Sequence, residues 1–391
     1  MSRRKMFEKP IGMRDTLPNL YNRKKETRDK ISNVIEGFGY EFLETPTLEF
    51  YETVGKASAI LDTQLFKLMD TQGHTIVLRP DMTAPIARLA ASRLYTGGYP
   101  LRLAYDTNVF RAQQRVGGRP AEFEQLGVEL IGDGTSSADA EVITLMIESL
   151  VKAGLPNFTV AIGHIGFINA LFFEVLGNEK SVKEIRRFLY EKNYVGYREH
   201  VNALPLPSIE KERLLAILQL RGRNDILEKA SELAQTEEAI KAIDELKQLW
   251  YSLEAHKVTS YVKLDFNLVP HMSYYTGILF EGYSPEVGYP ICGGGRYDQL
   301  LELFDRSADA TGFAIRLDYL LEAIKANMET VSKECVIFSQ EKREAAIEYA
   351  TSRREQGEKV VLQDLAGVSD VDSFTAKFKE VSYFIGSENH R

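Results

Sequence analysis

The block from residue 167 to 256 has an almost entirely helical pattern, and it interrupts a chain whose other segments alternate like strands. Alternation of apolar and polar residues is typical of half-buried strands. It occurs at residues 75–80, 101–110, 124–132, 260–269 and 277–283. The sequence therefore predicts an α+β fold in which helices flank an antiparallel sheet and a helical insertion occupies about 167–256.

Two helices before this block have clear sequence signals. In residues 19–36, Ile31, Val34 and Ile35 recur at helical spacing. Ser136 and Asp139 resemble a capping box at the start of the next helix, which is expected to end at Gly154. These helices are candidates to cover the sheet.

A smaller unit follows at the C-terminus. Residues 331–391 have the order strand, helix, strand, helix, strand, which is typical of an α/β domain. We therefore expect a main body over residues 1–325 and a separate domain over 331–391.

The charge balance argues against a chain whose main role is to bind nucleic acid. The net charge is −8 and the isoelectric point is near 5.5, whereas phosphate backbones are bound by dense fields of Lys and Arg. The apolar content of 44% is ordinary for a globular protein. We expect no tRNA partner.

Disulfide, metal and membrane roles also find no support in the sequence. Cys292 and Cys335 are too few for a disulfide framework and fit a reducing compartment. The six histidines show no metal-ligand spacing, and no apolar run approaches the length of a membrane span. The expectation is a cytoplasmic protein with no metal, no cofactor and no membrane partner.

Two short motifs are ambiguous by themselves. In the segment LRPDMTAP, Arg79 and Asp81 form either a local ion pair or part of a site. The glycine run at 293–295 predicts a turn, which either is structural or lets a ligand approach the backbone.

A polar set lies on one face of the strand at 124–132. Period-two alternation places Gln125, Gly127 and Glu129 together, and the loop of residues 111–121 before this strand carries Arg111. A glycine between two polar side chains leaves room for a small ligand, and the alternative is a solvent-facing strand surface.

The segment NLVPHMSYYTGILFEGY, residues 267–283, alternates like a strand but contains Pro270 and His271. Proline cannot donate to a sheet ladder, so its place in a strand needs an explanation. His271 has no serine or acid arrangement suggested around it and is interpreted as non-catalytic.

Taken in order, these motifs resemble histidyl-tRNA synthetase, a class II synthetase, over roughly residues 8–325. The motifs are GMRDTLP, TPTLEF, LRPDMTAP, FRAQQR, EFEQLGVELIG, LVPHMSYYTG, CGGGRYDQLL and TGFAIRLDYLL. The resemblance implies a class II synthetase-like antiparallel sheet, a dimer through the segment holding Pro46, and a helical insertion between the second and third class motifs.

The chain departs from the synthetase pattern at positions that serve catalysis in that family. Gln113 replaces a glutamate, and Ala121, Pro270 and Tyr319 replace arginines, while Arg316 fills a glycine position. Losing one preorganised donor from such a site typically costs about 3 to 4 kcal/mol. We therefore expect no catalytic residue and no synthetase activity.

The amino-acid pocket of the family is mostly preserved. The resemblance implies that Asp81, Thr83 and Gln125 hold a ligand ammonium, while Glu129 and Tyr275 pair with imidazole nitrogens. Asp81 is a glutamate in most synthetases. The full set of histidine-binding residues implied is Asp81, Thr83, Arg111, Gln125, Glu129, Tyr274 and Tyr275.

The C-terminal unit resembles a synthetase anticodon-binding domain that stops after its third strand. From residue 331 to 391 it carries 9 Lys and Arg against 11 Asp and Glu, a poor surface for tRNA. A synthetase-like chain that keeps the amino-acid pocket but has replaced the catalytic arginines resembles the regulatory subunits of ATP phosphoribosyltransferase.

That resemblance implies a non-catalytic function in the first step of histidine biosynthesis and in its feedback regulation by L-histidine. The implied partner is the short-form catalytic subunit, in a hetero-octamer that contains homodimers of this chain. Two alternatives stay open: a divergent histidyl-tRNA synthetase and a stand-alone histidine-binding sensor.

Overall fold

The computed structural model describes residues 8–94, 100–112, 119–269, 274–324 and 333–386. The chain forms two compact units, Met1–Lys325 and Ala326–Arg391. Each unit has its own hydrophobic core. Among the described residues, no helix is both long and apolar enough to cross a membrane.

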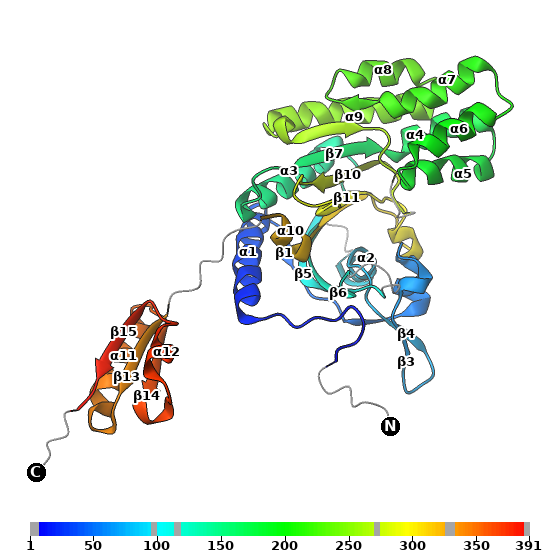
Figure 1. The fold of residues 1–391 in the computed structure, drawn as a ribbon. Coiled ribbons are helices and arrows are strands. Elements are labelled where there is room, and N and C mark those ends of the chain that lie inside the picture. The colour runs from blue at the N-terminus through cyan, green and yellow to red at the C-terminus, as the bar shows by residue number, and fades with distance from the viewer. Residues whose placement is uncertain (1–7, 95–99, 113–118, 270–273, 325–332, 387–391) are drawn as a thin grey trace, which may run out of the picture. The chain divides into compact units, whose positions relative to one another are not determined.

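The first unit is built on a nine-stranded sheet with the order β1-β5-β6-β12-β11-β10-β7-β9-β8 (Figure 1). The strands are β1 (Glu41–Phe42), β5 (Leu101–Phe110), β6 (Glu122–Ile131), β7 (Thr159–His164), β8 (Arg221–Gly222), β9 (Val262–Asp265), β10 (Ile278–Tyr283), β11 (Cys292–Arg296) and β12 (Ala310–Arg316). All neighbours pair antiparallel except β1 with β5 and β7 with β9. The expected sheet is confirmed, with two parallel pairs that alternation alone does not indicate.

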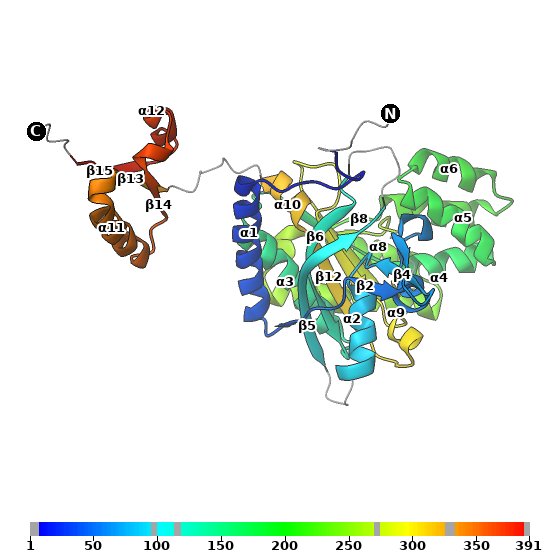
Figure 2. The same ribbon diagram turned by 90° about the horizontal axis from the view of Figure 1, so that it is seen from below.

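Helices pack on both faces of this sheet, as Figure 2 shows for α1 and α3 on one side and α2 on the other. The helices of these layers are α1 (Pro18–Gly37), α2 (Thr83–Leu89), α3 (Ser136–Ala153) and α10 (Leu317–Ile324). Along β6, Leu126, Val128 and Leu130 join the core under α1 and α3. Phe123 and Ile131 join the core around α2. Gln125 and Glu129, which alternate in phase with Phe123 and Ile131, therefore face the α2 side, where the site lies.

A second, three-stranded antiparallel sheet has the order β2-β4-β3. Its strands are β2 (Leu48–Phe50), β3 (Lys67–Met69) and β4 (Thr75–Leu78). The residues after β4 lead directly into α2, so this sheet positions Asp81 and Thr83.

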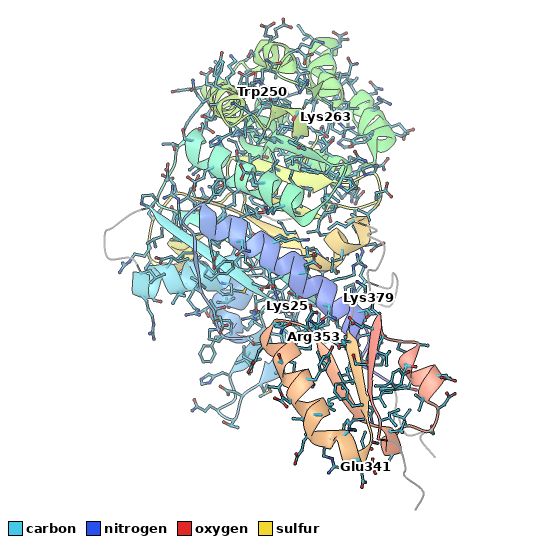
Figure 3. All side chains as sticks on the ribbon, turned by 90° about the vertical axis from the view of Figure 1, so that its left-hand side faces the viewer. Lys25, Trp250, Lys263, Glu341, Arg353 and Lys379 are labelled. Carbon is cyan, nitrogen blue, oxygen red and sulfur yellow. The ribbon has the colours of Figure 1, made fainter. Side chains whose placement is uncertain are left out.

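The helical insertion is present as expected. Its helices are α4 (Ile165–Leu176), α5 (Glu179–Tyr190), α6 (Tyr194–Ala203), α7 (Ser208–Ala216), α8 (Ile226–Leu233) and α9 (Glu237–Ala255). Trp250, labelled in Figure 3, lies on α9 and is 5% exposed. The apolar residues of the insertion share one core with those of α3 and β7. The insertion is therefore packed against the sheet.

The second unit contains a parallel sheet with the order β14-β13-β15. Its elements are β13 (Glu334–Phe338), α11 (Arg343–Glu355), β14 (Val360–Asp364), α12 (Val371–Thr375) and β15 (Glu380–Phe384). Arg353, labelled on α11 in Figure 3, donates from Nε to Glu334 at 2.9 Å. The predicted order of strands and helices is confirmed in this unit.

Three local predictions are wrong. The glycine run is a strand, β11, because its backbone pairs with β10 and β12. The strand expected within residues 267–283 begins only at Ile278. The cap of α3 is Thr135, which accepts from the Ala138 amide at 3.3 Å, and Asp139 is buried instead.

Candidate functional site

The site is built on the face of β6 that is turned toward α2. Gln125, Gly127 and Glu129 pair with Arg316, Ala314 and Gly312 of β12, so the two strands form a continuous floor. Gln125 is 5% exposed and Glu129 is 2% exposed. The solvent-facing alternative for this face is therefore wrong.

All seven residues expected to bind histidine line one narrow cavity on this floor, with a volume of about 50 Å³. We call this cavity the inner pocket. Its wall consists of Asp81, Thr83, Arg111, Gln125, Glu129, Tyr274 and Tyr275, together with Tyr105, Tyr297 and the glycines of β11 and β12. The fold thus brings together side chains separated by more than two hundred positions in the sequence, from Asp81 to Tyr297.

Asp81 lies at the end of the inner pocket that adjoins α2. Its carboxylate accepts from the Ser58 hydroxyl and from the Ala84 amide at 3.2 Å. The ion pair between Arg79 and Asp81 considered from the sequence is not formed, because Arg79 donates to the carbonyls of Thr45 at 2.7 Å and Asn108 at 2.9 Å. Asp81 is therefore held by the neutral donors Ser58 and Ala84 and can act as an acceptor for a ligand.

Glu129 is the second carboxyl group of the inner pocket. Burial raises the pKa of Glu129 to about 8, although hydrogen bonds with Tyr297 and Thr83 act to lower it. The hydroxyl of Tyr297 donates directly to Glu129 Oε2. A ligand that supplies an N–H donor or a positive charge here would stabilise the ionised carboxylate.

Gln125 contributes an acceptor that no protein group uses. Its Oε1 is buried and has no hydrogen-bond partner among the residues that the structure describes. An unsatisfied buried acceptor costs about 1–3 kcal/mol unless a ligand or water donates to it. The inner pocket thus presents acceptors from Asp81, Gln125 and Glu129, which favours a ligand rich in N–H donors.

Aromatic rings close the remaining wall. Tyr274 packs edge-on against Tyr275 at 5.0 Å and against Tyr297 at 5.8 Å between ring centroids. Burial raises the pKa of Tyr274 and of Tyr275, so both hydroxyls stay protonated. Such a wall suits a flat ring with polar nitrogens at its edge.

Arg111 marks the exit from the inner pocket. Its Nε donates to the carbonyl of Pro80 at 2.8 Å, and its guanidinium carbon lies 5.3 Å from the ring centroid of Phe123. Burial lowers the pKa of Arg111, and the charge of Asp81 opposes this shift. The guanidinium of Arg111 places a positive charge at this end of the inner pocket.

Beyond Arg111 lies a larger cavity of about 450 Å³, which we call the outer chamber. Its wall includes Arg119, Glu281, Arg316 and Tyr319. The guanidinium carbon of Arg316 lies 3.7 Å from the ring centroid of Phe123 and 3.6 Å from that of Tyr319. Arg316 also donates to Asp318 at 2.9 Å, so protein groups already hold it in place.

The positions expected to have lost catalytic residues offer no cation where the structure describes them. Ala121 is fully buried and only its backbone is engaged, with Arg111 and Gly12. Tyr319 is 8% exposed and packs against Tyr289 at 4.0 Å. Gln113, Pro270 and His271 lie outside the described residues.

Two residues of the site escaped the sequence analysis. Tyr105 is opposite Gly127 in the pairing of β5 with β6. Period-two alternation along β5 could therefore have predicted that Tyr105 lies on the same face as the site. Tyr297 lies two residues after the glycine run, and the turn expected there gave no indication that its hydroxyl would contact Glu129.

Comparison with known proteins identifies the family. Residues 12–320 match the family model described as Histidyl-tRNA synthetase, and residues 335–386 match the one described as Histidyl-tRNA synthetase HisZ, C-terminal domain. A Geobacillus sp. (strain WCH70) protein named ATP phosphoribosyltransferase regulatory subunit is 60% identical over 382 residues, covering 98% of this chain and 97% of the relative. The chain belongs to the ATP phosphoribosyltransferase regulatory subunit family.

Solved structures agree with this assignment. A crystal structure from Bacillus halodurans C, described as an ATP phosphoribosyltransferase regulatory subunit/histidyl-tRNA synthetase, has a TM-score of 0.93 and 58% identity, and the match covers 98% of this chain and 99% of that one. Histidyl-tRNA synthetase from Nostoc sp. PCC 7120 has a TM-score of 0.80 at 20% identity, with 95% of this chain and 88% of that one covered. Members of the regulatory subunit family therefore share the synthetase fold, as the sequence predicted.

Proposed function

We propose that this chain is the non-catalytic regulatory subunit of an ATP phosphoribosyltransferase and senses L-histidine in the inner pocket. In this function it activates a short-form catalytic subunit for the first step of histidine biosynthesis and carries feedback inhibition by histidine. Full-length similarity to relatives with this name supports the assignment.

The unused acceptor of Gln125, which lines the same pocket as Asp81 and Glu129, is the observation that carries the histidine proposal. The α-ammonium of histidine has three donors, and its imidazole has two nitrogens that need separate partners. Asp81, Thr83 and Gln125 take the ammonium, Glu129 and Tyr275 take the imidazole, and Arg111 takes the carboxylate. Each polar group of histidine then has a buried partner.

The outer chamber supports the proposal that this chain has no synthetase activity. Formation of an aminoacyl adenylate needs cations placed around phosphate oxygens. Tyr319 and Ala121 provide none, and Arg316 is committed to Asp318 and to two aromatic rings. We infer that histidine is bound in the inner pocket and is not activated.

Feedback requires histidine to bind one state of the assembly more tightly than another, typically by about 1–3 kcal/mol. We propose a cytoplasmic hetero-octamer in which homodimers of this chain join dimers of the catalytic subunit. The acidic C-terminal unit supports a role without tRNA, because 11 acidic residues exceed 9 basic ones from residue 331 onward.

Calorimetric titration of L-histidine onto this chain alone, and then onto its complex with the catalytic subunit, tests the proposal. Glu129→Ala should abolish binding while assembly stays intact. Glu122→Ala is the matched control, because Glu122 lies on the same strand and its side chain accepts from Asn108 near the surface, outside the inner pocket. Unchanged affinity in Glu129→Ala would place the histidine site elsewhere.

Two further measurements separate the alternatives. Histidine-dependent exchange of pyrophosphate with ATP would reveal a working histidyl-tRNA synthetase, and we expect none. Failure to co-purify with the short-form catalytic subunit would favour a stand-alone sensor.

A further inference from the structure

A second cavity lies in the helical insertion, away from the inner pocket and the outer chamber. It has a volume of about 520 Å³ and lies between α4, α5 and the start of α9. Figure 1 shows these helices together in the part of the first unit that the insertion forms. No residue of this cavity lines the other two, so its chemistry is separate.

Arg186 on α5 is the unusual member of its wall. Its Nε is buried and has no hydrogen-bond partner, and no ion pair to its guanidinium is formed within the described part of the chain. Burial lowers the pKa of Arg186, with no neighbouring carboxylate acting against it. Arginine stays charged in proteins, so partial burial of the Arg186 side chain without a carboxylate partner costs free energy that a bound anion would recover.

Asn169 on α4 adds an unused acceptor to the same cavity. Its Oδ1 is buried and has no donor among the described residues. A ligand that satisfies both side chains must therefore combine an anionic acceptor for Arg186 with an N–H or O–H donor for Asn169.

Two of the three carboxylates in the wall already interact with other basic residues. Glu174 is held by Arg213 through contacts of 3.0 and 2.9 Å, and Glu179 lies 3.5 Å from Lys183. Glu238, in the first turn of α9, is the remaining acidic residue of the wall. The pairing of Glu174 with Arg213 explains why Glu174 does not neutralise Arg186.

The rest of the wall is apolar. Ala170, Phe173 and Val182 line the cavity, and Phe173 is 54% exposed although it is a large aromatic residue. Binding of an apolar group would bury this ring, and such burial contributes roughly 25 cal/mol per Å² of surface removed from water. The cavity volume falls in the usual range for small-molecule sites, about 300–1,000 Å³.

We propose that this cavity is a second ligand site, for a free amino acid with an apolar side chain. Its carboxylate pairs with the guanidinium of Arg186, and its ammonium donates to Asn169 Oδ1. Its side chain packs on Phe173, Ala170 and Val182. The site is independent of the histidine pocket, so it would let the chain respond to a second amino acid.

Calorimetry on the full-length chain tests this site with L-phenylalanine and L-leucine as probes. Phenethylamine, which lacks the carboxylate, and hydrocinnamate, which lacks the amine, dissect the two polar contacts. We expect both amino acids to bind and each truncated probe to bind roughly 10- to 100-fold more weakly, as expected for the loss of a charged hydrogen bond.

Arg186→Met should weaken L-phenylalanine binding to the same extent. The matched control is Arg187→Met, because Arg187 lies on the same helix but its side chain is 59% exposed and pairs with Glu191. Arg186→Met should unfold at the same or a higher temperature than the wild type, because it removes a partly buried charge that has no carboxylate partner among the described residues. This separates loss of the site from loss of the fold.

Three results would overturn the proposal. These are absence of binding of both amino acids to the wild type, wild-type affinity in Arg186→Met, and loss of L-phenylalanine binding in Glu129→Ala. The last result would assign the binding to the inner pocket.

Discussion

The hydroxyl of Tyr297 donates a hydrogen bond to Glu129 at the floor of the inner pocket. Glu129 comes from β6, and Tyr297 follows the end of β11, so this contact joins two strands separated by β12 in the sheet. Because both groups are buried, the hydrogen bond fixes the carboxylate in one orientation. The inner pocket is therefore set before any ligand arrives.

Tyr297→Phe is expected to weaken histidine binding by roughly 10- to 100-fold, which is the range for loss of a hydrogen bond to a charged group. The carboxylate of Glu129 would lose a donor and become less favourable in its ionised form. Calorimetric titration of histidine measures the effect. Tyr349→Phe is the matched control, since its hydroxyl donates to Glu334 in the C-terminal unit at 2.9 Å. Equal affinities in the two variants would show that the Tyr297 hydroxyl does not support the site.

Glu129→Gln is expected to change how stability depends on pH. Burial raises the pKa of Glu129 to about 8 in the folded chain, from 4.5. A carboxyl whose folded pKa is raised stabilises the fold at low pH, and this contribution is lost as pH rises toward the folded value. The wild type should therefore lose stability relative to Glu129→Gln between about pH 5 and 8, with little further change above. Urea unfolding of both proteins without histidine, across this range, measures the difference, and parallel curves would contradict the raised pKa.

Much of this arrangement follows from short-range patterns in the sequence. Period-two alternation on β6 placed Gln125 and Glu129 on one face, and the motif order brought Asp81 and Tyr275 to the same pocket. The rest of the site could not be predicted because of the glycine run at 293–295. A run of glycines shows no alternation of apolar and polar residues, so a turn was predicted in place of β11, and the role of Tyr297 was not predicted. The position of the flexible Arg316 side chain could not be predicted from the sequence either, because it depends on tertiary contacts with Phe123 of β6 and Tyr319 of α10.

Arg316→Ala is expected to create a binding slot for a nucleobase. The guanidinium of Arg316 lies between the rings of Phe123 and Tyr319 in the wall of the outer chamber. Its removal would leave two aromatic surfaces able to hold a planar heterocycle. Fluorescence titration with 1,N6-ethenoadenosine triphosphate should show binding by the variant and none by the wild type. Arg306→Ala, which removes an arginine that does not line the chamber, is the control. Binding by the wild type would show that Arg316 does not block the chamber.

Arg296→Leu is expected to destabilise the first unit by about 3–5 kcal/mol, the usual effect of removing one partner from a buried ion pair. Arg296 is 6% exposed and Asp139 is 1% exposed, and their nearest atoms are 2.9 Å apart. Burial raises the pKa of Asp139, and Arg296 opposes this shift. Without the arginine, Asp139 would be more easily protonated, so the loss of stability should be smaller at pH 5 than at pH 8.

The double variant Arg296→Leu with Asp139→Leu removes both buried charges and should recover most of the lost stability, because Asp298, the other carboxylate that contacts Arg296, is partly exposed. Urea unfolding of the single and double variants measures this coupling. The ion pair also joins α3 to the end of β11, directly before Tyr297. Loss of stability should therefore be accompanied by weaker histidine binding in the single variant. If the double variant is no more stable than the single one, the pair acts through packing of the arginine side chain and not through its charge.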